Sequence, residues 1–163
     1  MEILVFRHGI AGDRADWAKT GRRDAERPLT AEGRRKTLEA AAGVARLTGA
    51  DLVASSPWKR ARQTALILGR ALEAPVADCP ALLPSAPFED AAAWLKARGA
   101  RRVVLVGHEP HLSGLATWLL TGGRRSALRL KKAQACLLTC PQPGPGKAVL
   151  VWSLPPRVLR RLA

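Results

Sequence analysis

Four residues of this sequence combine positive charge with a nucleophilic ring nitrogen, the combination that phosphoryl chemistry requires. They are two arginines and two histidines: Arg7, His8, Arg60 and His108. A guanidinium group binds phosphate oxygens through paired hydrogen bonds, and a neutral histidine can attack phosphorus. A second histidine, when protonated, can stabilise charge on the transferred oxygens. The residue types therefore favour a phosphoryl site, provided that the fold brings these side chains together.

Three of the four residues follow short apolar runs. One run ends on Arg7 and His8, and a similar run, Arg102–Gly107, ends on His108. Such runs are typical of strands buried on both faces of a parallel sheet. Ligands gather at the carboxyl ends of these strands, so we expect the three side chains at one edge of the sheet. Gly9 would permit the tight turn that lets neighbouring residues serve one ligand.

Arg60 is expected in the first turns of a helix. Asp51–Ser55 reads as a short strand, and Ser56-Pro57 is a typical helix start, with serine as cap and proline at the first helical position. Helical side chains lean towards the N-terminus, so the guanidinium can reach back over the strand end. Arg62 points elsewhere and is interpreted as a solvated arginine. His111, the third histidine, is interpreted as a surface or supporting residue of the next helix.

The other segments are predicted to be framework. Ile10–Pro28 is interpreted as a surface loop with some helix over the mouth of the first strand, and Ala74–Ala86 as a proline-rich connection. A helix over Ala31–Thr48 is expected to bury a stripe that includes Leu38, Ala41 and Ala45. Two more helices are expected, from about Pro87 to Gly99 and from Glu109 to Gly122.

The end of the chain changes from alternating strands and helices to a hairpin pattern. Lys132–Cys140 and Ala148–Leu154 are strand-like runs on either side of Pro141–Lys147, which would form a long turn. We therefore predict a single α/β domain over residues 1–163. Its architecture would be a three-layer α/β/α sandwich with a mainly parallel sheet and a C-terminal antiparallel hairpin at the sheet edge.

The composition and the apolar runs of the sequence indicate where in the cell the protein is located. The sequence is 47% hydrophobic and 25% charged, which is typical of a globular protein. No apolar run approaches the length of a membrane span, and Arg7 interrupts the first run before a signal-peptide core could form. The 3 cysteines, Cys79, Cys136 and Cys140, are an odd number without metal-type clustering. We therefore expect a cytoplasmic protein that does not bind a membrane.

The formal net charge of +14 raises the question of a polyanionic or phosphorylated partner. The codon usage of a genome could produce the same excess of arginine without any such partner. Nucleic-acid binding as the main function is disfavoured, because the arginines are scattered and no aromatic platforms accompany them.

Three separated motifs resemble those of the histidine phosphatase superfamily, which has the phosphoglycerate mutase-like fold. They are Arg7-His8-Gly9, the run Ser56–Thr64 and the run Gly107–Pro110. Within the superfamily the chain is most similar to the small SixA-type phosphohistidine phosphatases. The shared features are its short length, the segment from Arg27 to Arg34 and the closing residues Trp152–Pro155.

The resemblance implies a role for each of the four residues. His8 would be the nucleophile that becomes transiently phosphorylated, and Arg7, Arg60 and His108 would hold the phosphoryl oxygens. Water would then hydrolyse the phosphohistidine intermediate. The scheme needs no metal or other cofactor, and the sequence offers no carboxylate cluster of metal-ligand type.

The choice of substrate depends on a general acid. Superfamily members that act on phosphate esters use a carboxylic acid to protonate the leaving group, but the corresponding segment here, Ala81–Pro84, has none. Imidazole leaves more readily than an alkoxide, which favours phosphohistidine on a signalling or phosphotransfer protein. Glu109 and Asp13 are candidate acids, so a small phosphate ester remains the alternative substrate. A non-catalytic phosphate-binding or nucleic-acid-binding module is the alternative of another class.

Overall fold

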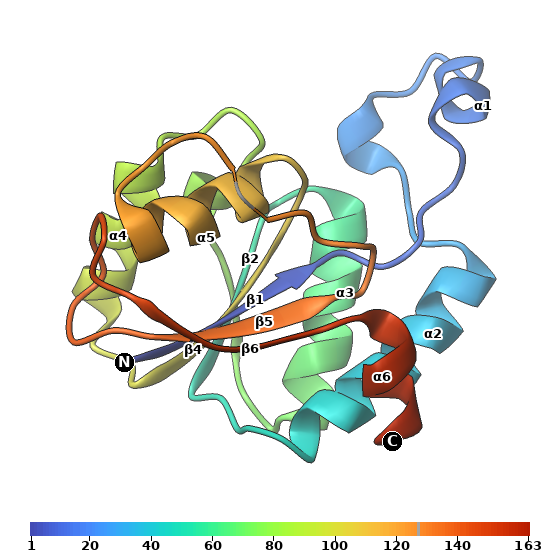
Figure 1. Cartoon of the computed structure of the whole chain (residues 1–163). Helices are drawn as coiled ribbons and strands as arrows, with labels where there is room; N and C mark the ends of the chain where they lie inside the picture. The colour runs from blue at the N-terminus through green and yellow to red at the C-terminus, as the bar shows by residue number, and fades with distance from the viewer. Residues whose placement is uncertain (127) are drawn as a thin grey trace.

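One mixed sheet runs through the molecule (Figure 1). The computed structural model describes residues 1–126 and 128–163, and within them six strands form the sheet in the order β3-β2-β4-β1-β5-β6. The strands are β1 (Glu2–Arg7), β2 (Leu52–Ser55), β3 (Val76–Asp78), β4 (Arg102–Gly107), β5 (Ala135–Thr139) and β6 (Val149–Leu154). The first four are parallel to one another, and β5 and β6 form the predicted antiparallel hairpin at the edge.

The two strands that carry site residues are neighbours. β1 pairs with β4 in parallel, and the register sets Arg7 opposite Gly107, so His8 and His108 leave the sheet at the same level. The apolar residues between the strand ends, Ile3 to Phe6 and Val103 to Val106, are buried. This is the burial on both faces that their continuous apolar pattern predicts.

Helices cover both faces of the sheet. They are α1 (Arg14–Ala18), α2 (Ala31–Ala45), α3 (Lys59–Ala71), α4 (Phe88–Arg98), α5 (His111–Thr121) and α6 (Pro156–Arg161), with short 3₁₀ turns η1 (Asp24–Glu26) and η2 (Pro80–Leu82). One apolar core joins the sheet to α4 and α5, and a second joins it to α2, α3 and α6. Figure 1 shows these two groups on opposite sides of the strands, so the predicted three-layer α/β/α sandwich is confirmed.

The structure differs from the predicted secondary structure at three places. The expected connection Ala74–Ala86 contains β3, a three-residue strand that pairs with β2. The helix predicted to start at Ser56 begins at Lys59, because the Ser56 backbone N–H donates to the carbonyl of Val106 (2.9 Å). The C-terminal α6 has no counterpart in the predicted elements.

The buried face of α2 also differs from the prediction. Leu38 is 52% exposed and Ala45 is exposed, although both were assigned to the core stripe. Glycines face inward instead, because backbone lies directly against the helix. A Cβ on Gly33 would sit 1.9 Å from the carbonyl oxygen of Ile10, and one on Gly43 would sit 1.9 Å from that of Leu159.

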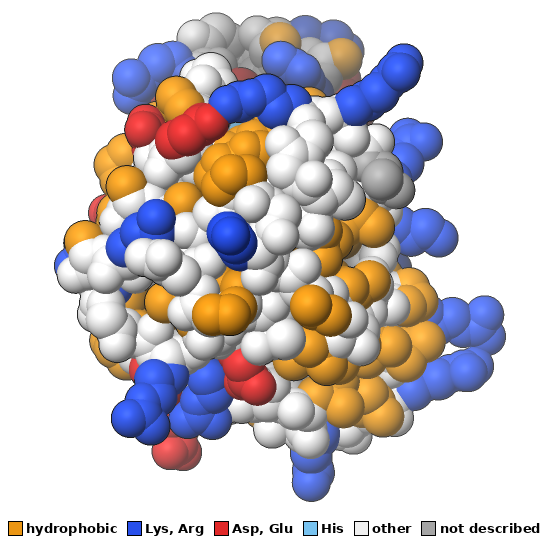
Figure 2. Space-filling model, turned by 60° about the vertical axis from the view of Figure 1, so that its left-hand side comes forward, with side chains coloured by type: hydrophobic (Ala, Val, Ile, Leu, Met, Phe, Trp, Pro, Cys, Tyr) orange, Lys and Arg blue, Asp and Glu red, His pale blue; other side chains and the backbone are white. Residues whose placement is uncertain are grey.

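Basic side chains dominate the charged part of the surface. Figure 2 shows Lys and Arg projecting at the top, along the right edge and at the bottom of one face, with few acidic groups among them. The three cysteines are free and buried. No helix in the described part of the chain has the length and apolar character needed to span a membrane.

Candidate active site

The four predicted residues line one cavity of about 670 Å³ at the carboxyl ends of β1 and β4. The rings of His8 and His108 lie with their centroids 5.1 Å apart. Arg60 reaches back from the first turn of α3, as its place in the helix predicts, and its Nε donates to Nε2 of His8 (3.2 Å). Arg7 borders the same cavity from the end of β1.

His8 has a defined tautomer. Its Nδ1 lies 2.7 Å from the carbonyl oxygen of Gly9, and a carbonyl can only accept a hydrogen bond. Nδ1 therefore carries the hydrogen, and Nε2 keeps the lone pair that receives the Arg60 N–H. Burial, together with the smaller effect of the Arg60 and Arg7 charges, lowers the pKa of His8 to about 3, so the ring is neutral at pH 7.

Gly9 allows the backbone to lie close to a helix. Its φ is not positive, so the position requires glycine for space and not for a left-handed backbone. A Cβ at this position would lie 2.2 Å from the hydroxyl oxygen of Thr37 on α2. The Gly9 N–H donates to the hydroxyl of Thr64 on α3 (3.1 Å). Both helices therefore fix the backbone that carries His8.

His108 is held by two residues, Ser56 and Trp58, that lie between the end of β2 and the start of α3. Its Nε2 lies 2.9 Å from the hydroxyl of Ser56, and the Trp58 ring lies against it at 4.7 Å between centroids. Burial lowers the pKa of His108 to about 2, and the nearby His8 and Arg60 add to the effect. This favours the neutral ring, although a negatively charged phosphoryl group in the cavity would raise the pKa again.

The two arginines are anchored in different ways. Arg7 donates from Nη1 to the carbonyl of Leu130 (2.7 Å), and its buried Nε has no hydrogen-bond partner in the described residues. Arg60, 4% exposed, donates from Nη1 to the Asp24 carbonyl (2.8 Å) and from Nη2 to the Asp24 carboxylate (3.0 Å). Both guanidinium groups are thus fixed at the cavity, where donors can meet phosphate oxygens.

Comparisons with known proteins agree with this geometry. The model of the histidine phosphatase superfamily, branch 1, matches residues 3–83. An uncharacterized protein of Picosynechococcus sp. (strain PCC 7002) is 39% identical over 138 residues, which are 82% of this chain and 81% of that protein. The solved structure of the protein histidine phosphatase SixA with tungstate is 26% identical with a TM-score of 0.79, over 98% of this chain and 99% of that one. The chain belongs to the histidine phosphatase superfamily.

One further likeness to a solved structure concerns the fold alone. A mycobacterial glucosyl-3-phosphoglycerate phosphatase is 22% identical with a TM-score of 0.66, over 93% of this chain and 98% of that one. The fold thus occurs in phosphatases whose names specify different substrates.

Several cavity residues escaped the sequence-based prediction. They are Arg14, Asp24, Arg27, Trp58, Pro84 and Lys132. Asp24 lies in η1 and accepts hydrogen bonds from Arg60 and, at 2.8 Å, from Nε of Arg27. Burial alone would raise the pKa of Asp24, but the hydrogen bond from Arg27 and the charge of Arg60 hold it below its ordinary value. The i,i+3 spacing of Asp24 and Arg27 was the available signal.

Both candidate acids, Asp13 and Glu109, border the cavity. The carboxylate of Asp13 caps α1 by accepting from the N–H groups of Ala15 (2.8 Å) and Asp16 (3.0 Å). These hydrogen bonds lower the pKa of Asp13, which disfavours the protonated form that an acid must have. Glu109 accepts a hydrogen bond from the Ser113 N–H at 3.2 Å.

Arg62 and His111, which the sequence analysis places outside the site, do not line the cavity. Arg62 is partly exposed and pairs with Asp78 of β3. His111 is buried, so its interpretation as a surface residue is wrong. Its Nε2 lies 3.1 Å from the Ala86 carbonyl and its ring packs on Phe88, so it supports the α4–α5 layer. Within the described residues, no group of three His, Cys, Asp or Glu side chains could hold a metal ion.

Proposed function

We propose that this protein is a metal-independent phosphatase that removes phosphate from phosphohistidine on a signalling or phosphotransfer protein. One observation carries the proposal: the unprotonated Nε2 of His8 faces a cavity lined by Arg7, Arg60 and His108. A neutral, fixed ring nitrogen among cationic donors is what nucleophilic attack on phosphorus requires.

In the first step, the phosphoryl oxygens bind the guanidinium groups of Arg7 and Arg60. The Nε–H of Arg60 then donates to a phosphoryl oxygen instead of Nε2 of His8, which frees the lone pair of that nitrogen. Nε2 of His8 attacks phosphorus, the bond from phosphorus to the substrate nitrogen breaks, and the electron pair leaves with that nitrogen. The Gly9 carbonyl stabilises the positive charge that develops on the His8 ring through its hydrogen bond to Nδ1–H. A substrate imidazole protonated on its other nitrogen leaves as a neutral ring, so the step needs no acid from the enzyme.

In the second step, water attacks phosphorus and the bond to Nε2 of His8 breaks. His8 thereby returns to its neutral form, and inorganic phosphate leaves. Glu109, which borders the cavity, is the group suited to accept the proton of the attacking water. The cationic side chains supply the electrostatic stabilisation that metal ions provide in other phosphoryl transfer enzymes.

Two observations support a phosphohistidine substrate. The segment 81–84 reaches the cavity through Pro84 and brings no carboxylate to it. The likeness to SixA, described as a protein histidine phosphatase, extends over nearly the whole of both chains. A tungstate ion is a tetrahedral oxyanion like phosphate, which is consistent with a phosphoryl site in that relative.

A small phosphate ester is the second candidate substrate. Glu109 borders the cavity and would supply the proton that an alkoxide leaving group needs. The fold likeness to the glucosyl-3-phosphoglycerate phosphatase agrees with this alternative. A non-catalytic phosphate-binding or nucleic-acid-binding module is disfavoured, because such a module has no use for a nucleophilic His8.

A direct comparison of rates tests the proposal. Hydrolysis of a phosphohistidine-bearing protein and of a panel of small phosphate esters is measured without added metal. We expect a marked preference for phosphohistidine, unchanged by chelators and reduced by at least about 10³-fold in His8→Ala. Preference for an ester would move the function to metabolite dephosphorylation, and substantial activity in His8→Ala would remove His8 as the nucleophile.

A further inference from the structure

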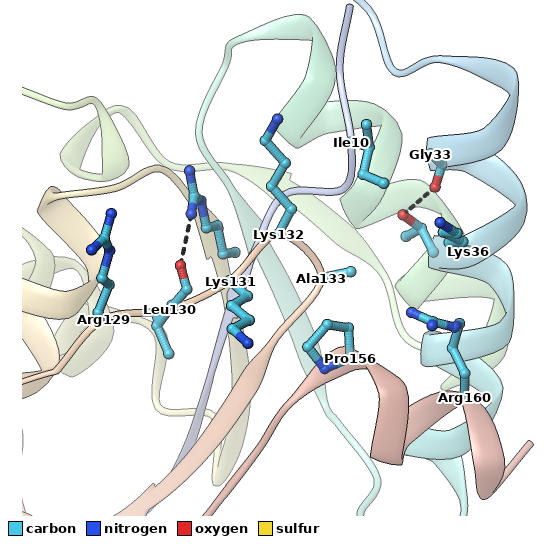
Figure 3. Close-up of a pocket in the computed structure, with 12 residues that line it drawn as sticks. Ile10, Gly33, Lys36, Arg129, Leu130, Lys131, Lys132, Ala133, Pro156 and Arg160 are labelled. Carbon is cyan, nitrogen blue, oxygen red and sulfur yellow. Dashed lines mark hydrogen bonds between the residues drawn. The ribbon is translucent and has the colours of Figure 1, made fainter.

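A second cavity of about 610 Å³ adjoins the active site, and Arg7 and Lys132 border both (Figure 3). Six of its lining residues are cationic: Arg7, Lys36, Arg129, Lys131, Lys132 and Arg160. None of the lining residues is Asp or Glu. We call this cavity the basic groove.

The basic groove is lined by apolar side chains as well as charged ones. Figure 3 shows Arg129 and Lys131 on the segment that leads into β5, with Arg160 of α6 across from them. Pro156 lies between Lys131 and Arg160, and Ile10 lines the groove beside Gly33. A ligand that fits the groove would therefore present both negative charge and some apolar surface.

Most of the positive charge is not neutralised from within the protein. Lys36 pairs with Glu32 (2.5 Å) and Arg160 with Glu39 (3.5 Å), both on the outer side of α2. Arg129, Lys131 and Lys132 form no ion pair with any residue that the structure describes. Burial lowers the pKa of Lys132, and the repulsion from Arg7 adds to this effect. An anion in the groove would relieve this repulsion.

We propose that the basic groove binds an acidic segment of the phosphoprotein substrate, rich in Asp and Glu with an apolar residue among them. The inference rests on the proposed function and names the partner surface. Lys132 borders both cavities, so one polypeptide can fill the active site and the groove together. A compact polyphosphate would match the charge but would gain nothing from Ile10 and Pro156. An acidic peptide uses both features.

A binding experiment tests the groove without any turnover. The probe is a fluorescently labelled, unphosphorylated peptide that alternates Glu and Asp with Leu, and its affinity is measured by anisotropy. The variant R129E/K131E reverses two groove charges outside the catalytic cavity. The control R70E/K96E makes the same change in net charge at exposed positions on α3 and α4 that line neither cavity.

We expect R129E/K131E to weaken peptide binding by roughly tenfold and the control to change it less than about twofold, since exposed charge contacts contribute modestly. Equal losses in both variants would mean that net charge alone attracts the peptide, and would overturn the proposal. Unchanged binding in the groove variant would overturn it too. So would tight binding of inorganic tripolyphosphate to a protein that does not bind the peptide.

A kinetic experiment then links the groove to the substrate. Two phosphohistidine peptides are compared, one with an acidic tail and one with a Ser/Gln tail of equal length. In R129E/K131E the KM of the acidic peptide should rise roughly tenfold with kcat unchanged, and the kinetics of the neutral peptide should not change. A rise in KM for both peptides would contradict the groove assignment. If the wild-type protein hydrolyses neither, the proposed function fails, and the anisotropy measurement alone decides whether the groove binds acidic peptide.

Discussion

The arginine that contacts His8 is positioned by a residue far away in the sequence. Asp24 holds two nitrogens of Arg60, through its carbonyl and its carboxylate, while Nε points at His8. Because the carboxylate is also paired with Arg27, the loop before α2 and the start of α3 are tied together at the cavity. Asp24 therefore acts as a positioning residue for Arg60.

Arg60 and Arg62 provide a matched pair of substitutions on one helix. Arg60→Ala should lower kcat/KM by about 10²-fold or more, because it removes fixed donors at the position where charge develops. Arg62→Ala should change kcat/KM less than about twofold, since its pair with Asp78 is an exposed ion pair of small effect. Steady-state kinetics on the best substrate make the comparison. Equal losses in the two variants would show that Arg60 is the wrong arginine.

The helices around the site depend on close backbone contacts. The docking of α6 onto α2 requires the absence of a side chain at Gly43, where a Cβ would sit 1.9 Å from the Leu159 carbonyl oxygen. Leu159 is fully buried and belongs to the core shared by α2 and α3. The same small helix, through Pro156 and Arg160, forms one wall of the basic groove.

Gly43→Ala should therefore destabilise the protein, although alanine is the better helix former. The gain in helix propensity is about 1 kcal/mol, whereas overpacking against backbone costs typically 1–3 kcal/mol, and the short contact puts this position at the upper end. We expect a net loss of roughly 1–2 kcal/mol in the free energy of unfolding, measured with urea. Gly144→Ala is the control, because its Cβ would have ordinary contacts. A Gly43→Ala protein as stable as the control would show that α6 is not held this way.

Local patterns were sufficient for the strands that carry the site, but not for features that depend on distant contacts. Continuous apolar runs identified β1 and β4, and the polar residues that end them converge as predicted. The start of α3 was misplaced, because Ser56 bonds to Val106 and His108 instead of capping the helix. Asp24 and Arg27 are three residues apart, but Arg60 lies 36 residues from Asp24, and no spacing pattern reveals that contact.

At the level of the whole molecule, part of the charge excess lies at the site. The net charge is +14, and nine of the 27 Lys and Arg residues line the two adjoining cavities: Arg7, Arg14, Arg27, Lys36, Arg60, Arg129, Lys131, Lys132 and Arg160. Cavities lined by one sign of charge raise the local concentration of oppositely charged ligands and speed their association. Composition alone could not distinguish this arrangement from a uniform bias, because it carries no information on position.

Stability against acid is a property of the whole fold, and here all 3 histidines of the chain are buried. Burial lowers the pKa of each, to about 3 for His8 and about 2 for His108. Above pH 6.5 the rings are neutral in both the folded and the unfolded chain. Below pH 6.5 the histidines of the unfolded chain bind protons that those of the folded chain do not. The free energy of unfolding therefore falls as the pH falls from 6.5 towards the lowered pKa values of the folded protein.

The free energy of unfolding should therefore drop steeply between pH 6.5 and 4.5, by roughly 1–2 kcal/mol for each histidine whose folded pKa lies below that range. Urea unfolding at a series of pH values measures the slope. Carboxylates titrate in part of the same range, so the double variant His8→Asn/His108→Asn serves as the reference, because it keeps the carboxylates and removes two of the buried rings. The variant should show a shallower slope than the wild type. Parallel slopes would mean that the two rings already bind protons in the folded protein, which would also remove the neutral nucleophile from the proposed mechanism below neutral pH.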